Sequence, residues 1–193
     1  LLDLGLSSLQ LDSQSRGFSF KESSFLDMRF DQDSRIDASR IINKSSESEI
    51  ADIIYYYGEE RRSRFIAKKI FQNRPINRVE HLVEVLKRCT PPHKRNKILA
   101  RVFQSFRIAV NKELDNLSSF LEKYLDCLKV GGKIIIISFH SLEDRIVKSS
   151  FKESSRKGQL SIITKKPIVA CEDERIKNSR SKSAKLRLSL IHI

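Results

Sequence analysis

The stretch Leu1-Leu2-Asp3-Leu4-Gly5-Leu6-Ser7-Ser8 opens the chain and has the pattern of a buried β-strand that runs into a turn. The apolar run is interrupted by Asp3, and glycine and serine, which are common in turns, follow. Open parallel sheets bind their ligands beyond the carboxyl ends of the strands. We therefore expect a functional site here, and we expect earlier strands of the same sheet to lie outside this chain.

A second strand is predicted at 133–139, which is a nearly continuous apolar run. Such runs are typical of parallel strands that are buried on both faces. His140 and Ser141 follow it, and the next helix is expected at 142–151 with Ser141 as its N-cap and Asp144 at its third position. The polar residues after the two strands would then meet at one edge of the sheet.

Between these strands, residues 36–96 contain three short stretches with the helical spacing of apolar side chains. Ser46 and Glu49 predict a capping box, and Gly58 is expected to end the helix that follows it. The second helix is expected at 59–72, and a third begins at an Asn77 cap. In the second helix the side chains expected to point inward are Phe65, Ile66 and Ile70.

The segment at 9–35 interleaves aromatic and basic residues without a regular period, and its apolar anchors favour an ordered, packed loop. Beyond residue 97, helices are expected at 98–110 and over a leucine stripe at 114–128. Strand-like runs follow at 160–164 and 167–170. This order of elements predicts an α/β core with a helical insertion.

The composition points to a polyanionic partner. The 193 residues carry a formal net charge of +13, and the sequence pI is about 9.8. Nucleic acid is the favoured partner over a membrane surface, although a generally basic composition, or a fragment that has lost an acidic half, would give the same charge. The sequence has no apolar run of membrane-spanning length. Cys89, Cys127 and Cys171 are far apart and predict neither a disulfide framework nor a zinc site.

Two clusters could carry chemistry. A carboxylate and an amide at Asp3 and Gln10 could bind a cationic or amino-acid-bearing ligand, or Asp3 could cap the turn and Gln10 be solvated. His140, Glu143 and Asp144 allow an acid/base role, while a metal site is not expected. The alternative is that these three residues serve only to begin the helix. No nucleophile elbow of the Gly-x-Ser-x-Gly type is present.

Long motifs along the chain resemble the RsmH (MraW) family. They are Asp3–Asp12, Arg16–Phe20, Leu26–Arg29, Tyr57–Glu60, Phe103–Ile108, Val110–Leu114, Ile137–Lys148 and Asn178–Arg187. The resemblance implies an S-adenosylmethionine-dependent enzyme that methylates N4 of one cytidine in the decoding region of 16S rRNA, acting in the cytoplasm on the small ribosomal subunit. It also implies the C-terminal portion of a Rossmann-like methyltransferase core with an inserted helical domain, and it leaves homodimer formation open.

The resemblance also implies roles for individual residues. Asp3 and Gln10 would contact S-adenosylmethionine, while His140 and Glu143 are the candidates for contacting or deprotonating the target amine. Phe18, Phe20 and Phe30 are candidates for stacking on the target base. The residues expected to contact rRNA are Arg16, Arg29, Arg145, Lys148, Arg180, Lys185 and Arg187. Leu9 and Ser179 depart from the family, which usually has proline at both positions.

The resemblance divides the chain into four parts. Residues 1–35 are expected to be the fourth strand of the core with its following loop, 36–96 the helical insertion, and 97–187 the remaining core with a basic tail. Residues 188–193 are expected to be a translated sequencing adaptor. The family's upstream glycine-rich loop and acidic residue for the cofactor are expected outside this chain, so the chain alone is expected to be inactive. The alternative is a non-catalytic RNA-binding module.

Overall fold

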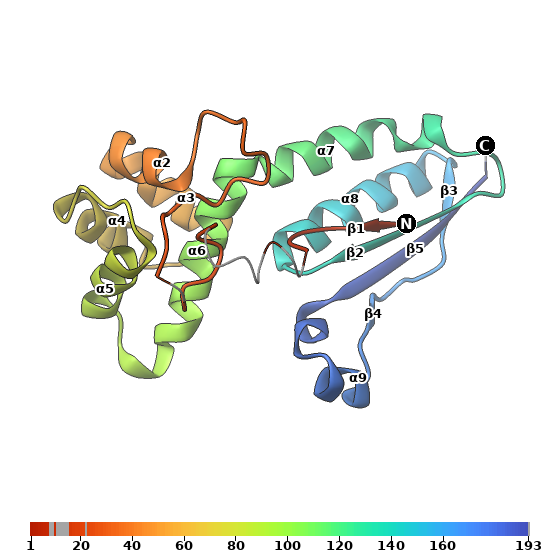
Figure 1. Cartoon of the computed structure of the whole chain (residues 1–193). Coiled ribbons are helices and arrows are strands. Elements are labelled where there is room, and N and C mark those ends of the chain that lie inside the picture. Colours follow the sequence, from red (N-terminus) through yellow and green to blue (C-terminus); the bar gives the residue numbers. More distant parts are fainter. Residues whose placement is uncertain (8–9, 11–15, 22, 193) are drawn as a thin grey trace. The chain divides into compact units, whose positions relative to one another are not determined.

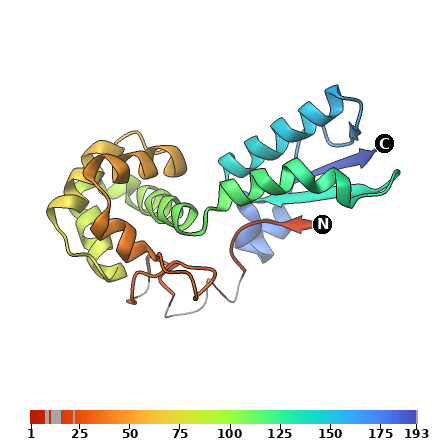
Figure 2. The same cartoon turned by 90° about the horizontal axis from the view of Figure 1, so that it is seen from above.

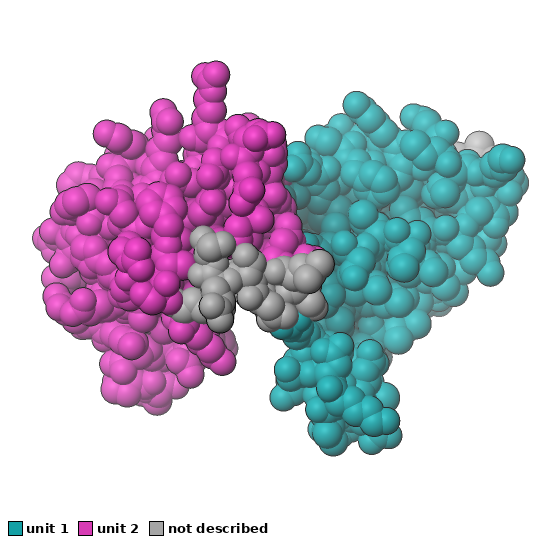
Figure 3. All heavy atoms as spheres, viewed as in Figure 1, with its two compact units in different colours: residues 1–5, 113–193 teal, residues 6–112 magenta. Residues whose placement is uncertain are grey.

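The computed structural model describes residues 1–7, 10, 16–21 and 23–192. The chain forms two compact units, one made of residues 1–5 and 113–193 and the other of residues 6–112 (Figure 3). The helical unit therefore begins earlier and ends later than the predicted insertion at 36–96. It takes in the loop after the first strand and the helix that starts at Arg95.

The first unit is built on a mixed sheet (Figure 1). The strand order is β1-β2-β5-β3, and β4 pairs with β5. Strands β1 and β2 are parallel, with Asp3 opposite Ile137, whereas β5 runs antiparallel to β2 and β3. The strands are β1 (Leu2–Asp3), β2 (Lys133–Ser138), β3 (Leu160–Ile162), β4 (Ile168–Val169) and β5 (Lys185–Ile191).

Two helices cover one face of this sheet, α7 (Glu113–Lys123) and α8 (Ser141–Arg156). Figure 2 shows them side by side, and their apolar side chains form one core with Ile134 and Ile136 of β2. The alternate residues Ile135 and Ile137 are only half-buried. The expectation that this strand is buried on both faces is therefore wrong for the described chain.

Three short helices complete this unit, one directly after α7 and two between β4 and β5. The 3₁₀ helix η2 (Tyr124–Cys127) extends α7, so the leucine stripe predicted at 114–128 is not one continuous helix. The short helices α9 (Glu172–Lys177) and η3 (Ser179–Ser183) precede β5. Burial raises the pKa of the Tyr124 hydroxyl, which lies 3.4 Å from the Ser154 hydroxyl.

The last residues of the chain are part of the sheet. Strand β5 continues through Leu188 to Ile191, and the Ile191 side chain is buried in the core. The Ile191 amide donates to the Gly132 carbonyl at 2.9 Å, and the Gly131 amide donates to the Ile191 carbonyl at 3.0 Å. Residues 188–191 therefore form part of the sheet, while their origin in a translated sequencing adaptor stays a prediction.

The second unit is helical. Its elements are α2 (Ala38–Lys44), α3 (Glu47–Gly58), α4 (Ser63–Gln72), α5 (Val79–Cys89), η1 (Pro92–Lys94) and α6 (Arg95–Asn111). The capping box of Ser46 and Glu49 is confirmed. Glu59 takes the left-handed conformation that ends α3, while a Cβ on Gly58 would lie 2.9 Å from the Arg101 carbonyl oxygen of α6. Gly58 is thus required by the close approach of two helices.

Two details of the helical prediction are wrong. Phe65 is exposed, whereas its neighbours Ile66 and Ile70 are buried as expected. Asn77 does not cap α5, because Arg78 occupies the N-cap position. The Asn77 side-chain oxygen instead accepts hydrogen bonds from the Ser39 hydroxyl and the Asn43 amide of α2.

The described part of the loop before α2 is packed, as expected. Phe18, Leu26 and Met28 are buried in the helical core. Asn111 at the end of α6 fixes this loop, because its side-chain oxygen accepts from the Phe30 amide at 2.6 Å and its nitrogen donates to the Met28 carbonyl at 2.7 Å. No helix in the described part of the chain has the length and apolarity needed to cross a bilayer. The three cysteines are unpaired.

Candidate active site

The candidate site lies at the edge of the sheet where the parallel strands β1 and β2 end. The Leu4 amide donates to the Ile137 carbonyl at 3.0 Å, so the two strands stay paired up to this edge. Gly5 follows with φ of 89°, a left-handed conformation that side chains disfavour. A Cβ there would be 3.6 Å from the Phe139 ring, so the backbone angle rather than lack of space calls for glycine.

Asp3 is exposed at the end of β1. Its carboxylate has no hydrogen bond or ion pair with any residue that the structure describes, so its oxygens are available to a ligand. Gln10 belongs to the helical unit, where its side-chain oxygen accepts from the Ser7 amide at 3.1 Å and its own amide donates to the Ser7 hydroxyl at 3.2 Å. One end of the Gln10 amide is therefore already in use.

His140 and Glu143 together begin helix α8. His140 is the N-cap residue, and its Nδ1 accepts from the Glu143 amide at 3.4 Å. A carboxylate oxygen of Glu143 accepts from the backbone amides of Phe139 at 2.9 Å and His140 at 3.3 Å. The predicted cap at Ser141 and third position at Asp144 are thus wrong by one residue, since a neutral histidine nitrogen can accept the capping bond that serine usually accepts.

Glu113 at the start of α7 joins this pair. One ligand atom each from Glu113, His140 and Glu143 lies within 4.8 Å of the others. His140 Nε2 is buried and lies 3.2 Å from a Glu143 carboxylate oxygen without hydrogen-bond geometry. Two carboxylates beside an imidazole can accept hydrogen bonds from an amine and can receive its proton.

The same three donors have the composition of a divalent-metal site, although Glu143 is already engaged with two backbone amides. Sequence reasoning missed Glu113, because it lies far from His140 along the chain. Its only local feature, an acidic residue in the first turn of a helix, is common.

Asp144 is engaged with two basic residues of β5. Its carboxylate accepts from Nε and Nη2 of Arg187 at 2.6 and 3.2 Å, and the Lys185 ammonium lies 3.7 Å from it. Burial would raise the pKa of the Asp144 carboxyl, but the hydrogen bonds from Arg187 and the two positive charges hold that pKa below its ordinary value. Asp144 therefore stays ionised at neutral pH and ties α8 to β5.

Several residues predicted to contact rRNA have structural partners. Arg187 is 6% exposed and engaged with Asp144. Arg16 donates to the carbonyls of Arg29 and Phe30, while Arg29 pairs with Asp27 at 2.6 Å and donates to the carbonyls of Gln32 and Ser34. These positions favour a structural role for the three arginines.

The proposed stacking rings are also used internally. Phe18 is buried, and its ring centroid lies 5.8 Å from that of Phe30. The Phe20 ring lies 5.8 Å from Phe103 of α6. By contrast, Arg145 and Lys148 on α8 and Arg180 in η3 are exposed, as an RNA-contacting role requires.

Known proteins resemble this chain over nearly its whole length. The model of the MraW methylase family matches residues 1–191. The chain is 50% identical over 196 residues to a protein of Rippkaea orientalis, covering 100% of this chain and 64% of that protein. It is 52% identical over 193 residues to one of Acaryochloris marina, covering 98% and 64%, and 48% identical over 193 residues to one of Thermotoga neapolitana, covering 97% and 63%.

All three relatives are named "Ribosomal RNA small subunit methyltransferase H". The chain spans about 64% of the length of the first two curated relatives that it matches. The match extends over nearly every residue described above, including both strand ends and the helical unit between them. The chain belongs to the MraW methylase family.

Proposed function

We propose that this chain is the larger part of an enzyme that transfers a methyl group from S-adenosylmethionine to N4 of a cytidine in the decoding region of 16S rRNA, acting on the small ribosomal subunit in the cytoplasm. The observation that carries the proposal is the parallel end of β1 and β2 in a member of this family, where an exposed Asp3 and a left-handed Gly5 lie at the edge from which β2 leads to His140. The relatives' name and the net charge of +13 support an RNA substrate.

S-adenosylmethionine suits the polar side chains that the chain presents at Asp3 and Gln10. S-adenosylmethionine would supply an electrophilic methyl group on a positively charged sulfur. The free carboxylate of Asp3 can accept hydrogen bonds from its cationic amino group, and Gln10 supplies a side-chain amide. These two residues would hold the cofactor.

The chemistry requires orientation more than acid strength. A cytosine amino group is a poor nucleophile, because its lone pair is delocalised into the ring. Holding that nitrogen in line with the methyl group supplies much of the rate. His140 or Glu143 would accept a hydrogen bond from the amine and take up the proton that the nitrogen loses on methylation, and Glu113 adds a third acceptor to the same cluster. The target base must leave its stack to reach them.

The test uses an enzyme of full family length with substitutions at the positions of His140 and Glu143. His140→Asn and Glu143→Gln retain side-chain acceptors for the helix cap while removing the titrating groups. We expect single-turnover methylation to fall by about 10²-fold or more, as for loss of a general base. Unchanged single-turnover rates in both variants would remove these residues from the chemistry.

The site of methylation needs its own measurement. Nucleoside mass spectrometry of the product separates N4-methylcytidine from ring-methylated cytidine. A product methylated elsewhere would contradict the proposed specificity and leave rRNA methylation intact.

A non-catalytic RNA-binding module is the second candidate. It is favoured by one observation, namely that His140 and Glu143 are already engaged as a helix cap. Such a module would bind rRNA equally well with and without S-adenosylmethionine, and its affinity would not respond to Asp3→Ala.

A further inference from the structure

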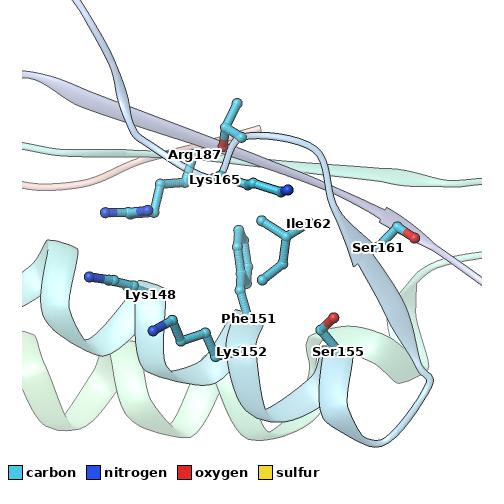
Figure 4. Close-up of a pocket in the computed structure, with 9 residues that line it drawn as sticks. Lys148, Phe151, Lys152, Ser155, Ser161, Ile162, Lys165 and Arg187 are labelled. Carbon is cyan, nitrogen blue, oxygen red and sulfur yellow. The ribbon is translucent and has the colours of Figure 1, made fainter.

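A second polar site lies on the first unit between helix α8 and the strand β3. It is a pocket of about 330 Å³. Figure 4 shows Lys148 and Lys152 reaching from α8 and Lys165 and Arg187 coming from the sheet side, with Phe151 and Ile162 between them. The lining contains no aspartate or glutamate, so a positive rim surrounds an apolar wall.

Three of these cations have no partner among the residues that the structure describes. Lys148, Lys152 and Lys165 are exposed, and they have no ion pair or hydrogen bond with the residues that the structure describes. By contrast, Lys157 on the same helix pairs with Glu153 at 2.7 Å. Arg187 also lines the pocket, but its charge is compensated by the Asp144 carboxylate, so the uncompensated charge is that of the three lysines. Like charges gathered without acids repel one another, and an anionic ligand relieves that repulsion.

The pocket lies at the end of β3, level with Ile134 of β2, because both Ile162 and Ile134 pair with Ser189. Both β2 and β3 run antiparallel to β5, so β3 ends in the same direction as β2. The loop after β3 continues along β5, since Ile163 and Thr164 donate to the Leu188 carbonyl at 3.1 and 3.2 Å. Lys165 therefore lies beyond the carboxyl end of β3, and Lys148 lies two turns into the helix that His140 begins.

We propose that this pocket is a docking site for the phosphate backbone of the RNA substrate, in which Lys148, Lys152 and Lys165 contact phosphates. The inference rests on the proposed function for the identity of the RNA. Charge complementarity selects the occupant, since a phosphodiester chain offers evenly spaced negative charges to a rim of three free ammonium groups.

The test compares two triple variants of the 193-residue chain. One carries Lys148→Ala, Lys152→Ala and Lys165→Ala. The matched control carries Lys123→Ala, Lys129→Ala and Lys133→Ala, which are exposed lysines of the same unit outside the pocket. Both triples remove the same charge, and circular dichroism checks that both are folded.

Affinity for a labelled oligonucleotide with the sequence of the rRNA decoding region is measured by fluorescence anisotropy at several salt concentrations. We expect the pocket triple to lose about tenfold or more in affinity at about 0.1 M salt, and its log–log salt slope to fall by about 2, as for three lost phosphate contacts on a single strand. The control triple should lose less than about threefold.

The outcomes separate this inference from the proposed function. Equal losses of RNA affinity in the two triple variants would mean that binding depends only on general electrostatic attraction. Unchanged affinity in the pocket triple would mean that the pocket does not contact RNA. Either result overturns the docking site while the RNA substrate stands. A wild-type chain that binds no RNA would overturn both, and a pocket triple that loses affinity for anionic vesicles but not for RNA would assign the pocket to a membrane surface.

Discussion

The guanidinium of Arg187 on β5 and the carboxylate of Asp144 on α8 form a two-bond ion pair, with N–O distances of 2.6 and 3.2 Å. Arg187 is 6% exposed, and its strand lies in the middle of the sheet. Removing one member of a buried pair leaves the other charge uncompensated. We expect Arg187→Met to lower the free energy of unfolding by about 3 kcal/mol in urea titrations.

Lys157→Met is the matched control for that variant. Its pair with Glu153 is exposed at both ends, so the expected change is small. An equal loss in the free energy of unfolding for the two substitutions would show that burial of the Arg187–Asp144 pair does not add to its contribution to stability.

The same pair makes stability depend on pH. The folded pKa of Asp144 lies below its ordinary value of 3.8, so folding favours the ionised carboxyl. Its contribution is therefore complete above that value and is lost as the pH falls through the folded pKa. Thermal unfolding of wild type and Asp144→Asn, followed from pH 7 down to about pH 2, should show a stability gap that narrows only in the acid range. A gap that is constant with pH would contradict this assignment.

Substitutions at His140 separate its capping role from any chemistry. His140→Ala removes the acceptor for the Glu143 amide and should cost about 1 kcal/mol of stability, whereas His140→Asn keeps an acceptor and should cost less. Differential scanning calorimetry distinguishes the two. If the alanine variant were as stable as wild type, the Nδ1 contact would have no capping role.

Gly58→Ala tests the close approach of α3 and α6. Alanine favours a helix by about 1 kcal/mol over glycine, but the new Cβ would lie 2.9 Å from a backbone oxygen of Arg101. We expect the cost of the clash to exceed the gain in helix propensity, so that the variant is less stable by about 1–2 kcal/mol. Asp52→Ala, on the exposed side of the same helix, should change the unfolding midpoint little. A stabilised Gly58→Ala would mean that the helices can separate without cost.

Binding of S-adenosylmethionine can be measured by calorimetry on this chain and on the longer Thermotoga neapolitana relative. Among the described residues, Asp3 has a carboxylate without a partner, and the side-chain amide of Gln10 is partly used by Ser7. We expect weak binding or none by this chain and clear binding by the relative. Micromolar affinity of this chain would show that Asp3 and Gln10 suffice.

Parts of this fold follow directly from sequence patterns. Polar residues after two apolar runs indicated that β1 and β2 end at one edge, and the parallel pairing of Asp3 with Ile137 agrees. Helical spacing and the Ser46–Glu49 box located α3, because capping depends on neighbouring residues alone. Local rules succeed where the deciding contacts are local.

Strand β5 shows why other parts were missed. Arg187, Ser189 and Ile191 are buried, whereas the leucines between them are only half-buried. This pattern reverses the usual alternation of strands, because Asp144 compensates the buried Arg187 from a distant helix. Glu113 was missed for the same reason, since only the folded chain brings it to His140.

The pairing of Leu2 with Ile136 has a consequence for how the chain folds. The helical unit is one continuous segment, 6–112, whereas the sheet joins residues from both sides of it. Closing so long a loop is slow, while contacts within a continuous helical segment form early. During synthesis the helices can be complete before β2 exists, so β1 must wait for its partner and the active-site edge forms after the helical unit.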